Sequence, residues 1–281
     1  MSSLTSLPAL HPARPWKPSA LLWLTIVLHP VALGLLAAFP AHWPWIVGAL
    51  VSNHVTLAIV GLLPRSRLLG INWVRLPASA ARAGLIAITI DDGPDPEVTP
   101  QVLDVLDAYR ATATFFCIGA RAKRHPDLCR EIVRRGHAVE NHSQNHRHHF
   151  SIFGPRRMAL EVTACQETLT RITGDRSRFF RPTAGLRNAF LDPILARNGL
   201  TLASWTRRAF DTRNRDADDV TARLLHSLAA GDILLLHDGH AARTRDGQPI
   251  ILAVLPRLLE AIARASLRTA TLRTASEPSA A

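Results

Sequence analysis

Two adjacent carboxylates, Asp91 and Asp92, lie between a short apolar run and a strong turn signal. The run Leu85 to Ile90 predicts a buried strand, and Gly93-Pro94 predicts the turn. Carboxylates at the carboxyl end of such a strand lie where α/β folds collect their catalytic groups. Side by side they repel each other unless a cation or a shared proton intervenes. The pair therefore predicts a metal site, and the alternative is a solvated Asp-Asp turn.

A second candidate set of ligands follows about fifty residues later, where His142 and His146 are four residues apart. On a helix or helical turn this spacing places both imidazoles on one face, as in helical zinc motifs. With Asp92 they would form a three-ligand set that leaves one coordination position open, as catalytic zinc sites do. The alternative is a histidine-rich surface loop, because His148 and His149 follow closely.

Four signatures, in order between about Gly84 and Leu272, resemble the polysaccharide deacetylases of carbohydrate esterase family 4, the NodB homology domain. They are Thr89 to Pro94 for T-[FI]-D-D-G-P, His142 to His146 for H-[ST]-x-x-H, Phe180 to Gly185 for the R-x-P-x-G region, and Leu235 to His237 for L-x-H. Their order makes the resemblance specific. It implies a hydrolase that removes the N-acyl group from an amino sugar.

The residues and the resemblance together assign the metal and the general base. A divalent cation held by Asp92, His142 and His146 would polarise the acyl carbonyl and lower the pKa of a bound water. Zinc is expected from the ligand types, and cobalt or nickel also fits them. By resemblance, Asp91 would take the proton from the water. Arg181 would hold Asp91 ionised through a charge-assisted hydrogen bond.

The resemblance also assigns groups on the substrate side. His237 would protonate the leaving amine, with Asp211 as its partner. Because the family's Asp-Trp signature is only partly matched around Asp211, a solvated loop aspartate is the alternative. The backbone N–H of Ala184 would stabilise the oxyanion, and Leu235 would line the same side. The family usually has an aromatic residue where this chain has Ala184, so a ring that could stack on the sugar is lost.

Composition and charge limit the partners. The chain of 281 residues has 33 Lys and Arg against 22 Asp and Glu, a net charge of +11. Because the arginines are scattered and no basic run is interleaved with aromatics, nucleic-acid binding is not expected. A basic face toward anionic lipid or a phosphate-bearing substrate is expected instead. Three cysteines, Cys117, Cys129 and Cys165, match no metal pattern and predict buried apolar positions in a reducing compartment.

Two apolar spans, residues 19–39 and 45–63, are each long enough to cross about 30 Å of hydrocarbon. They predict a transmembrane hairpin with His29 and His54 bonded across it. A signal peptide is the alternative for the first span, although a small-x-small cleavage site is absent. Buried helices of a soluble protein are a further alternative. Basic residues flank the hairpin and its hinge has none, which predicts both ends on the cytoplasmic side. They are Arg14, Lys17, Arg65, Arg67 and Arg75.

The rest of the chain alternates predicted strands and helices, which indicates a parallel α/β sheet. The resemblance makes this a distorted (β/α)7 barrel. The strands are expected near residues 85–90, 112–117, 137–140, 178–180, 200–204, 232–236 and 268–272. The predicted organisation is a cytoplasmic segment (1–18), the hairpin (19–63), a linker (64–83), the deacetylase domain (84–274) and a disordered tail (275–281).

These observations predict a multi-pass inner-membrane enzyme with a cytoplasmic catalytic domain. Its expected substrate is an N-acetylated amino sugar in a lipid-linked saccharide or polysaccharide precursor. One alternative keeps the chemistry but faces outward, onto peptidoglycan or an exported polysaccharide. Another is a catalytically silent carbohydrate-binding relative, against which the intact base and acid argue.

Overall fold

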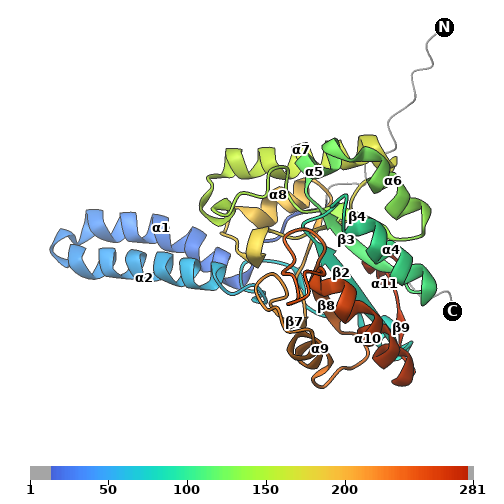
Figure 1. Ribbon diagram of the computed structural model, residues 1–281. Helices are drawn as coiled ribbons and strands as arrows, with labels where there is room; N and C mark the ends of the chain where they lie inside the picture. The colour runs from blue at the N-terminus through green and yellow to red at the C-terminus, as the bar shows by residue number, and fades with distance from the viewer. Residues whose placement is uncertain (1–13, 278–281) are drawn as a thin grey trace, which may run out of the picture.

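Parallel strands and helices alternate in the computed structural model, which describes residues 14–277 (Figure 1). The strands are β1 (Asn72–Trp73), β2 (Leu85–Asp91), β3 (Ala113–Cys117), β4 (Ala138–Asn141), β5 (Phe179–Phe180), β6 (Thr201–Ala203), β7 (Arg207–Arg208), β8 (Ile233–His237) and β9 (Arg268–Thr269). All their pairings are parallel, in the order β1-β6-β5-β4-β3-β2-β8-β7, with β9 beside β2. Within the described chain β1 and β7 do not pair, so the sheet is an open half-barrel. The predicted α/β barrel of the polysaccharide deacetylase type is confirmed.

Helices cover the outer face of the sheet, as Figure 1 shows. They are α3 (Ala78–Arg82), α4 (Thr99–Ala108), α5 (Gly119–Arg124), α6 (Pro126–Arg134), α7 (Pro155–Thr173), α8 (Leu191–Arg197), α9 (Ala217–Leu225), α10 (Ile250–Arg264) and α11 (Leu272–Ser276). Short 3-10 turns form η2 (Phe150–Ile152) and η3 (Thr183–Gly185). The main hydrophobic core lies between the sheet and helices such as α4 and α10.

Successive side chains of the central strand β2 point to opposite faces of the sheet, as in any strand. Its isoleucines pack in the core beneath the helices, whereas Ala87 packs with Phe116 on the other face. Thr89 and Asp91 share the face of Ala87. Because Asp91 is in register with His237 on β8, the strand ends bring a carboxylate and an imidazole to one end of the barrel interior.

The N-terminal helices α1 (Ala20–Ala38) and α2 (Trp43–Gly61) form a hairpin through the turn η1 (Pro40–His42). The spans Ala20–Ala38 and Pro40–Gly61 are long and apolar enough to cross a membrane, with mean hydropathies of 2.1 and 1.4. The hairpin projects from the side of the barrel (Figure 1). Its helix bounds agree with the predicted spans to within about two residues.

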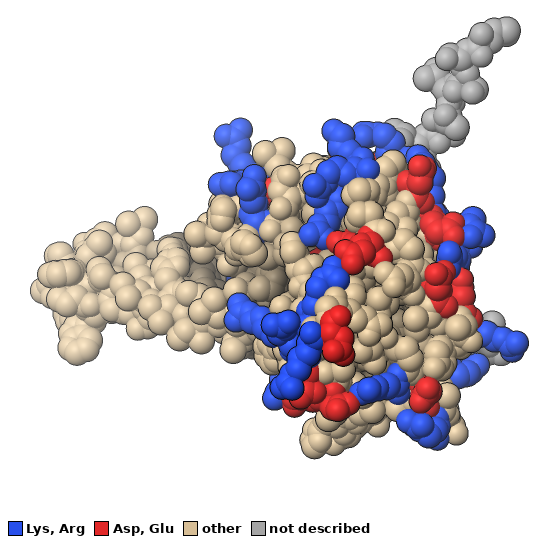
Figure 2. Space-filling view, viewed as in Figure 1, with Lys and Arg blue, Asp and Glu red and all other residues tan. Residues whose placement is uncertain are grey.

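Apolar side chains cover the hairpin surface. Trp23 is 54% exposed and Trp45 is 81% exposed. Helices of a soluble protein rarely expose so many large apolar side chains to water. Figure 2 shows that neither basic nor acidic side chains lie on the projecting hairpin. His29 Nε2 lies 3.3 Å from His54 Nε2, so the predicted contact across the hairpin is confirmed.

The end of α2 packs against the chain that follows β5, at the carboxyl end of that strand. The backbone N–H of Arg187 donates to the Gly61 carbonyl at 3.1 Å, and a Cβ at position 61 would collide with the Arg187 carbonyl. A Cβ on Gly185 would lie 2.8 Å from Pro64 and 2.5 Å from the ring of Trp205. The hairpin root therefore contacts the loop that follows β5.

Several segments differ from the sequence prediction. The predicted linker 64–83 contains β1 and α3, and β1 extends the sheet beside β6. The last predicted strand, 268–272, ends at Thr269. The helix α11 enters the tail predicted to be disordered, and Ala275 is buried. Residues 1–13 and 278–281, which belong to the predicted end segments, lie outside the described residues.

All three cysteines are free and buried. Cys117 ends β3, whereas Cys129 and Cys165 lie on the inner faces of α6 and α7. Their predicted role as apolar filler is confirmed. Burial raises the pKa of the Cys165 thiol, which disfavours a reactive thiolate there.

Candidate active site

The carboxyl ends of β2, β4, β5 and β8 surround a cavity of about 330 Å³. Eight of the nine predicted site residues lie on its wall or donate to a residue there. The wall contains Asp91, Asp92, His142, His146, Ala184, Leu235 and His237, while Arg181 reaches it through a bond to Asp91. Asp211 lies behind His237, as described below. The parallel topology therefore gathers signatures that are up to about 145 residues apart in the sequence.

A fully buried guanidinium supports the first aspartate. Arg181 Nη1 donates to Asp91 Oδ1 at 2.6 Å and to Thr89 Oγ1 at 2.8 Å. Its remaining donors reach the carbonyls of Ala203 (2.9 Å) and Ser204 (2.8 Å). Burial lowers the pKa of Arg181, and the charge of Asp91 acts in the opposite direction. The arginine is thus held rigidly, with Asp91 as its ionised partner.

The second aspartate faces imidazoles instead of a guanidinium. His142 Nε2 lies 3.2 Å from Asp92 Oδ1, and His146 Nε2 lies 3.0 Å from the same oxygen. His142 Nδ1 lies 2.7 Å from the Arg181 carbonyl, a contact that requires an Nδ1–H donor. Loss of the Nε2 proton would then leave the Nε2 lone pair for a cation beside Asp92. Metal-binding histidines are oriented by contacts of this kind. These residues therefore fit a divalent cation.

The structure adds His240 to the ligand candidates. Its Nδ1 lies 3.2 Å from Asp92 Oδ2, and ligand atoms of Asp92, His146 and His240 all lie within 4.8 Å of one another. His240 Nε2 accepts from Arg121 Nη2 at 2.9 Å. Sequence reasoning missed His240, although its position three residues after His237 was a usable signal. The group of Asp92, His146 and His240 thus contains two of the three predicted ligands, Asp92 and His146.

The protonation preferences of this cluster follow from burial and contact. Burial disfavours the charge of Asp92, yet hydrogen bonds from His142, His146 and His240 outweigh it and hold its pKa well below the usual range. Burial lowers the pKa of His146. Burial also acts to lower the pKa of His142, but the charge of Asp91 and the contact with Asp92 outweigh it and raise that pKa. Metal binding needs the carboxylate and neutral imidazoles, so a cation would replace the proton that the aspartates favour on His142.

The histidine on β8 has its own carboxylate. His237 Nδ1 lies 2.8 Å from Asp211 Oδ1, and the backbone N–H of His237 donates to Asp211 Oδ2 at 2.8 Å. Burial alone would lower the pKa of His237, but the Asp211 charge and hydrogen bond raise it to about 9. The structure brings these two residues together, as the partial signature predicted. His237 is therefore a protonated donor at neutral pH.

The chain conformation around the cavity is unusual. Asp92, His146, Ala184 and His240 are non-glycine residues with positive φ angles of 77°, 49°, 55° and 60°. Such residues cost free energy and gather where function requires a particular orientation. Ala184 lies in η3 and Leu235 on β8, both on the cavity wall. The φ of Ala184 turns the backbone of η3 at that wall.

The two signature histidines do not lie on a helix, contrary to the expectation from their spacing. Residues 142–146 form a loop after β4, in which Ser143 and His146 have positive φ. The loop is held by Asn145, whose backbone and side-chain N–H groups donate to Glu161 on α7 at 2.8 Å. A tight loop thus produces the convergence of imidazoles that a helical turn would also give.

Comparison with known proteins agrees with this geometry. A sequence model of the family described as "Polysaccharide deacetylase" matches residues 78–203. A peptidoglycan-N-acetylglucosamine deacetylase from Bacillus cereus is 32% identical over 190 residues, covering 67% of this chain and 86% of that protein. A chitooligosaccharide deacetylase from Sinorhizobium fredii is 36% identical over 165 residues, covering 58% and 76%.

Solved structures share the fold. A family 4 carbohydrate esterase from Streptomyces lividans superposes with a TM-score of 0.60 at 30% identity, covering 66% of this chain and 91% of that chain. A family 4 pseudoenzyme from Bacillus anthracis gives a TM-score of 0.65 at 17% identity, covering 73% and 69%, which is a likeness of fold alone.

The chain belongs to the polysaccharide deacetylase family, as its four ordered signatures predict. Deacetylases of this family are hydrolases that act on carbon–nitrogen bonds other than peptide bonds, and they depend on a metal. The cluster of Asp92, His146 and His240 is a possible metal-binding triad in this chain.

Proposed function

We propose that this protein is a metal-dependent deacetylase that removes the N-acetyl group from an amino sugar of a lipid-linked saccharide or polysaccharide precursor. The observation that supports this substrate most directly is the contact between the hairpin root and the catalytic loop: Pro64 and Gly185 adjoin the same indole, that of Trp205. If the hairpin spans the membrane, the cavity opens close to the lipid surface. A substrate carried by a lipid would meet it there.

The proposed chemistry uses the residues in separate roles. A divalent cation at Asp92, His142 and His146 supplies polarisation of the acyl carbonyl and a more acidic water. Asp91, held ionised by Arg181, accepts the proton of the attacking water. The backbone N–H of Ala184 is assigned to the developing oxyanion. All these assignments rest on the match to the family's signatures, and those of Asp91, Arg181 and the metal ligands also rest on the distances given above.

Departure of the sugar amine requires a proton, because an unprotonated amine is a poor leaving group. His237 donates it in this proposal, since its raised pKa keeps the imidazole protonated at neutral pH. Asp211 fixes the ring through Nδ1 and leaves Nε2 for the substrate. Leu235, two residues earlier on the same face of β8, forms part of the apolar wall beside the acyl group.

An assay of acetate release tests the reaction. Purified full-length protein should deacetylate a polyprenyl-diphosphate-linked N-acetylglucosamine, lose activity with a chelator and recover it with zinc. His226→Ala serves as a matched control, because His226 lies outside the cavity and should leave activity unchanged. Full activity in a chelated, metal-free sample would contradict metal dependence. A deacetylase that accepts only free polymers would contradict the lipid-linked substrate.

We further propose that the catalytic domain lies on the cytoplasmic side, because basic residues flank the hairpin and its hinge carries none. An outward orientation is the second candidate, and it is favoured by the relatives whose names specify peptidoglycan. Alkaline phosphatase fused after Ala281 should be inactive, and a cytoplasmic reporter at the same position should be active. The opposite pair of results would favour an exported polymer as substrate.

A catalytically silent relative is the remaining candidate, since a pseudoenzyme of the family shares this fold. The arrangement of base, acid and metal-ligand candidates argues against it. A module that only binds sugar has no need of the Asp91–Arg181 pair or of a protonated His237.

A further inference from the structure

The catalytic cavity adjoins a second cavity that the proposed reaction does not use. This neighbour has a volume of about 380 Å³, and both cavities are lined by Trp205 and Arg208. Pro64 and Arg65, directly after the hairpin, line the second cavity as well. A ligand that extends from the catalytic cavity toward the hairpin would therefore pass Arg208.

Arg208 is a cation without a polar partner in the described part of the chain. Its guanidinium lies 5.3 Å from the ring of Trp205 and 4.8 Å from the ring of Phe210. Its Nε is buried and makes no hydrogen bond, and the carboxylates of the described residues are all more than 4 Å away. Stacking holds the plane of a guanidinium and leaves its N–H edge available. Arg208 is thus oriented by aromatic rings and retains its capacity to bind an anion.

The other arginines of this cavity divide into two kinds. Arg207 is neutralised by Asp232 at 2.8 Å, and Arg223 by Asp219 at 2.7 Å. Arg65 donates only to a backbone carbonyl, that of Thr206 at 3.2 Å. Of the four arginines that line this cavity, Arg65 and Arg208 therefore have no carboxylate partner among residues 14–277. Figure 2 shows basic side chains on the barrel beside the hairpin base.

The carboxylates of the catalytic cavity do not compete for these cations. Asp91 is bonded to Arg181, and Asp92 faces three imidazoles. Phe210 is 51% exposed and has a φ of 57°, a backbone conformation that costs free energy in a non-glycine residue. Leu62 and Leu63, which precede the cavity residues, are exposed apolar side chains at the end of α2. Arg208 thus lines both cavities, Arg65 lines the second cavity alone, and Leu62 and Leu63 directly precede Pro64 of that cavity in the chain.

We propose that Arg208, together with Arg65, binds the phosphate group that joins the amino sugar to its lipid. This assignment rests on the proposed function, and it names the chemistry that would select the substrate. Guanidinium groups bind phosphate oxygens through paired charge-assisted hydrogen bonds. The sugar would occupy the cavity at Asp91, the phosphate would contact Arg208, and the lipid would continue along Leu62 and Leu63.

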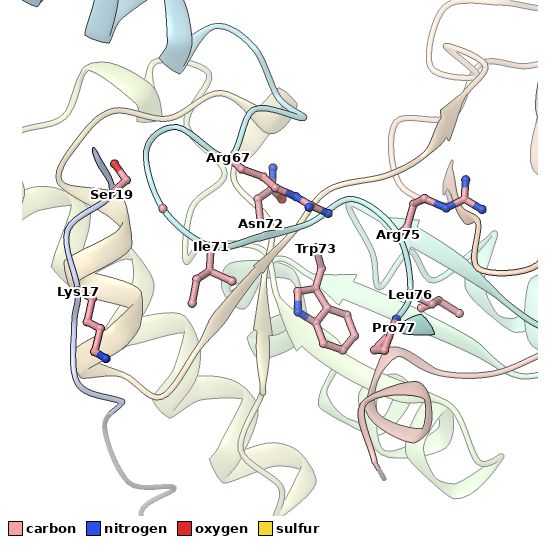
Figure 3. A pocket seen from close by; sticks show the side chains of 10 residues that line it. Lys17, Ser19, Arg67, Ile71, Asn72, Trp73, Arg75, Leu76 and Pro77 are labelled. Carbon is pink, nitrogen blue, oxygen red and sulfur yellow. The ribbon is translucent and has the colours of Figure 1, made fainter. Parts of the chain in front are cut away.

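A second basic groove provides a matched control. It has a volume of about 610 Å³ and lies along β1, where Lys17, Arg67 and Trp73 line it without any residue of the catalytic cavity (Figure 3). Within the described residues Arg67 has no carboxylate partner either. It therefore matches Arg208 in charge and in proximity to the hairpin. Arg67→Gln removes one charge from the same region and separates general attraction to anionic lipid from binding at Arg208.

The test compares kcat/KM values of the zinc-loaded full-length protein for four substrates. They are geranyl-diphosphate-linked N-acetylglucosamine, N-acetylglucosamine 1-phosphate, a phosphate-free chitooligosaccharide and a carboxylate-bearing peptidoglycan fragment. Arg208→Gln should lower the ratio of kcat/KM for the geranyl diphosphate to that for the chitooligosaccharide roughly 10- to 100-fold, mainly through KM. Arg208→Lys should give an intermediate ratio, and Arg67→Gln should leave it unchanged.

Binding without turnover gives a second measurement. Asp91→Asn protein should bind N-acetylglucosamine 1-phosphate more tightly than N-acetylglucosamine in calorimetry, and adding Arg208→Gln should remove that difference. A preference for both N-acetylglucosamine 1-phosphate and the geranyl diphosphate over the phosphate-free sugar would indicate recognition of the phosphate itself. A preference for the geranyl compound alone would indicate that the lipid is recognised as well. An unchanged ratio in Arg208→Gln, or a selective loss for the peptidoglycan fragment, would overturn the proposal. A wild-type enzyme that deacetylates only the chitooligosaccharide would instead refute the proposed function.

Discussion

The site has a deep half, the strand ends of the catalytic cavity, where Asp91 and His237 have charged partners. Its outer half is the adjoining cavity toward the hairpin, where Arg65 and Arg208 have no carboxylate among the described residues. Asp91 and Arg181 are paired at 2.6 Å, and Asp211 and His237 at 2.8 Å. Paired buried charges are held in fixed positions, and chemistry at one atom needs fixed positions. Unpaired cations at an opening are available to an anion from outside. The two halves differ because one performs the reaction and the other, in our proposal, selects what enters.

The largest expected effect on the deep half comes from removing the proposed general base, Asp91, while the metal ligands stay in place. Asp91→Asn should keep the metal content nearly intact and lower turnover roughly 10²- to 10⁴-fold, because it removes the proton acceptor. Asp92→Asn should instead lower metal affinity by about an order of magnitude or more. Metal analysis and acetate release on both variants would check the assignment. If Asp91→Asn empties the site and Asp92→Asn does not, the two roles are reversed.

A pH profile examines the second pair of the deep half. With its pKa near 9, His237 is the acid whose deprotonation should form the basic limb of the profile of kcat/KM. Asp211→Asn removes the charge that raises this pKa, and burial then lowers it, so the limb should move to lower pH. At pH 8.5 the rate should fall by roughly tenfold for each pH unit that the pKa of His237 moves below 8.5, because the protonated fraction falls by that factor. A basic limb that stays in place would show that Asp211 does not control the acid.

His240 lies at the border of the two halves, with a side chain that is 55% exposed. If it contributes to metal binding, His240→Ala should lower zinc affinity roughly tenfold, whereas His146→Ala should abolish stoichiometric binding. Competition with a chromophoric chelator measures both. His148→Ala is the control, because His148 also lines the cavity but belongs to no ligand cluster of the described residues. Equal affinities in the wild type and His240→Ala would place His240 outside the metal site.

The smallest expected effect concerns the ring that the family has at position 184. Ala184→Tyr should improve KM for a chitooligosaccharide roughly two- to tenfold, because an aromatic ring adds contact with the sugar face. The backbone there already has a positive φ, so the substitution does not change the type of strain. Steady-state kinetics would measure the change, with Leu160→Tyr, an exposed position on α7, as the control. An unchanged KM would mean that the sugar does not approach η3.

The deep half was predictable because its signatures follow strands with clear patterns. The run before Asp91 and the run before His237 are continuous apolar stretches, and buried parallel strands have this composition. A parallel sheet then brings the ends of such strands together without further information. The hairpin was predictable for a similar reason, since a long apolar span leaves little choice of conformation in a membrane.

The outer half was not predictable, because it depends on segments that are too short to have a pattern. The strands β1 and β7 contain two residues each, so neither shows the alternation of a longer strand. The contacts of Arg208 with the rings of Trp205 and Phe210 depend on the local chain conformation, including the positive φ of Phe210, which the sequence does not specify. His240 was missed for the same reason: a positive φ after β8 turns the chain back toward Asp92.

Ser204 Oγ donates a hydrogen bond to the Pro64 carbonyl at 2.6 Å, and this contact limits where the chain can be truncated. The match to the family begins at residue 78, and a chain cut there would lose β1, Pro64 and the Gly61 carbonyl that accepts from Arg187. The loop around η3 would lose its support on one side, although all the signature residues would remain. Removal of residues 1–77 would therefore keep all the signature residues but remove contacts that hold the loop around η3. Extraction of the whole chain in a lipid nanodisc is the sounder route to its true kinetics.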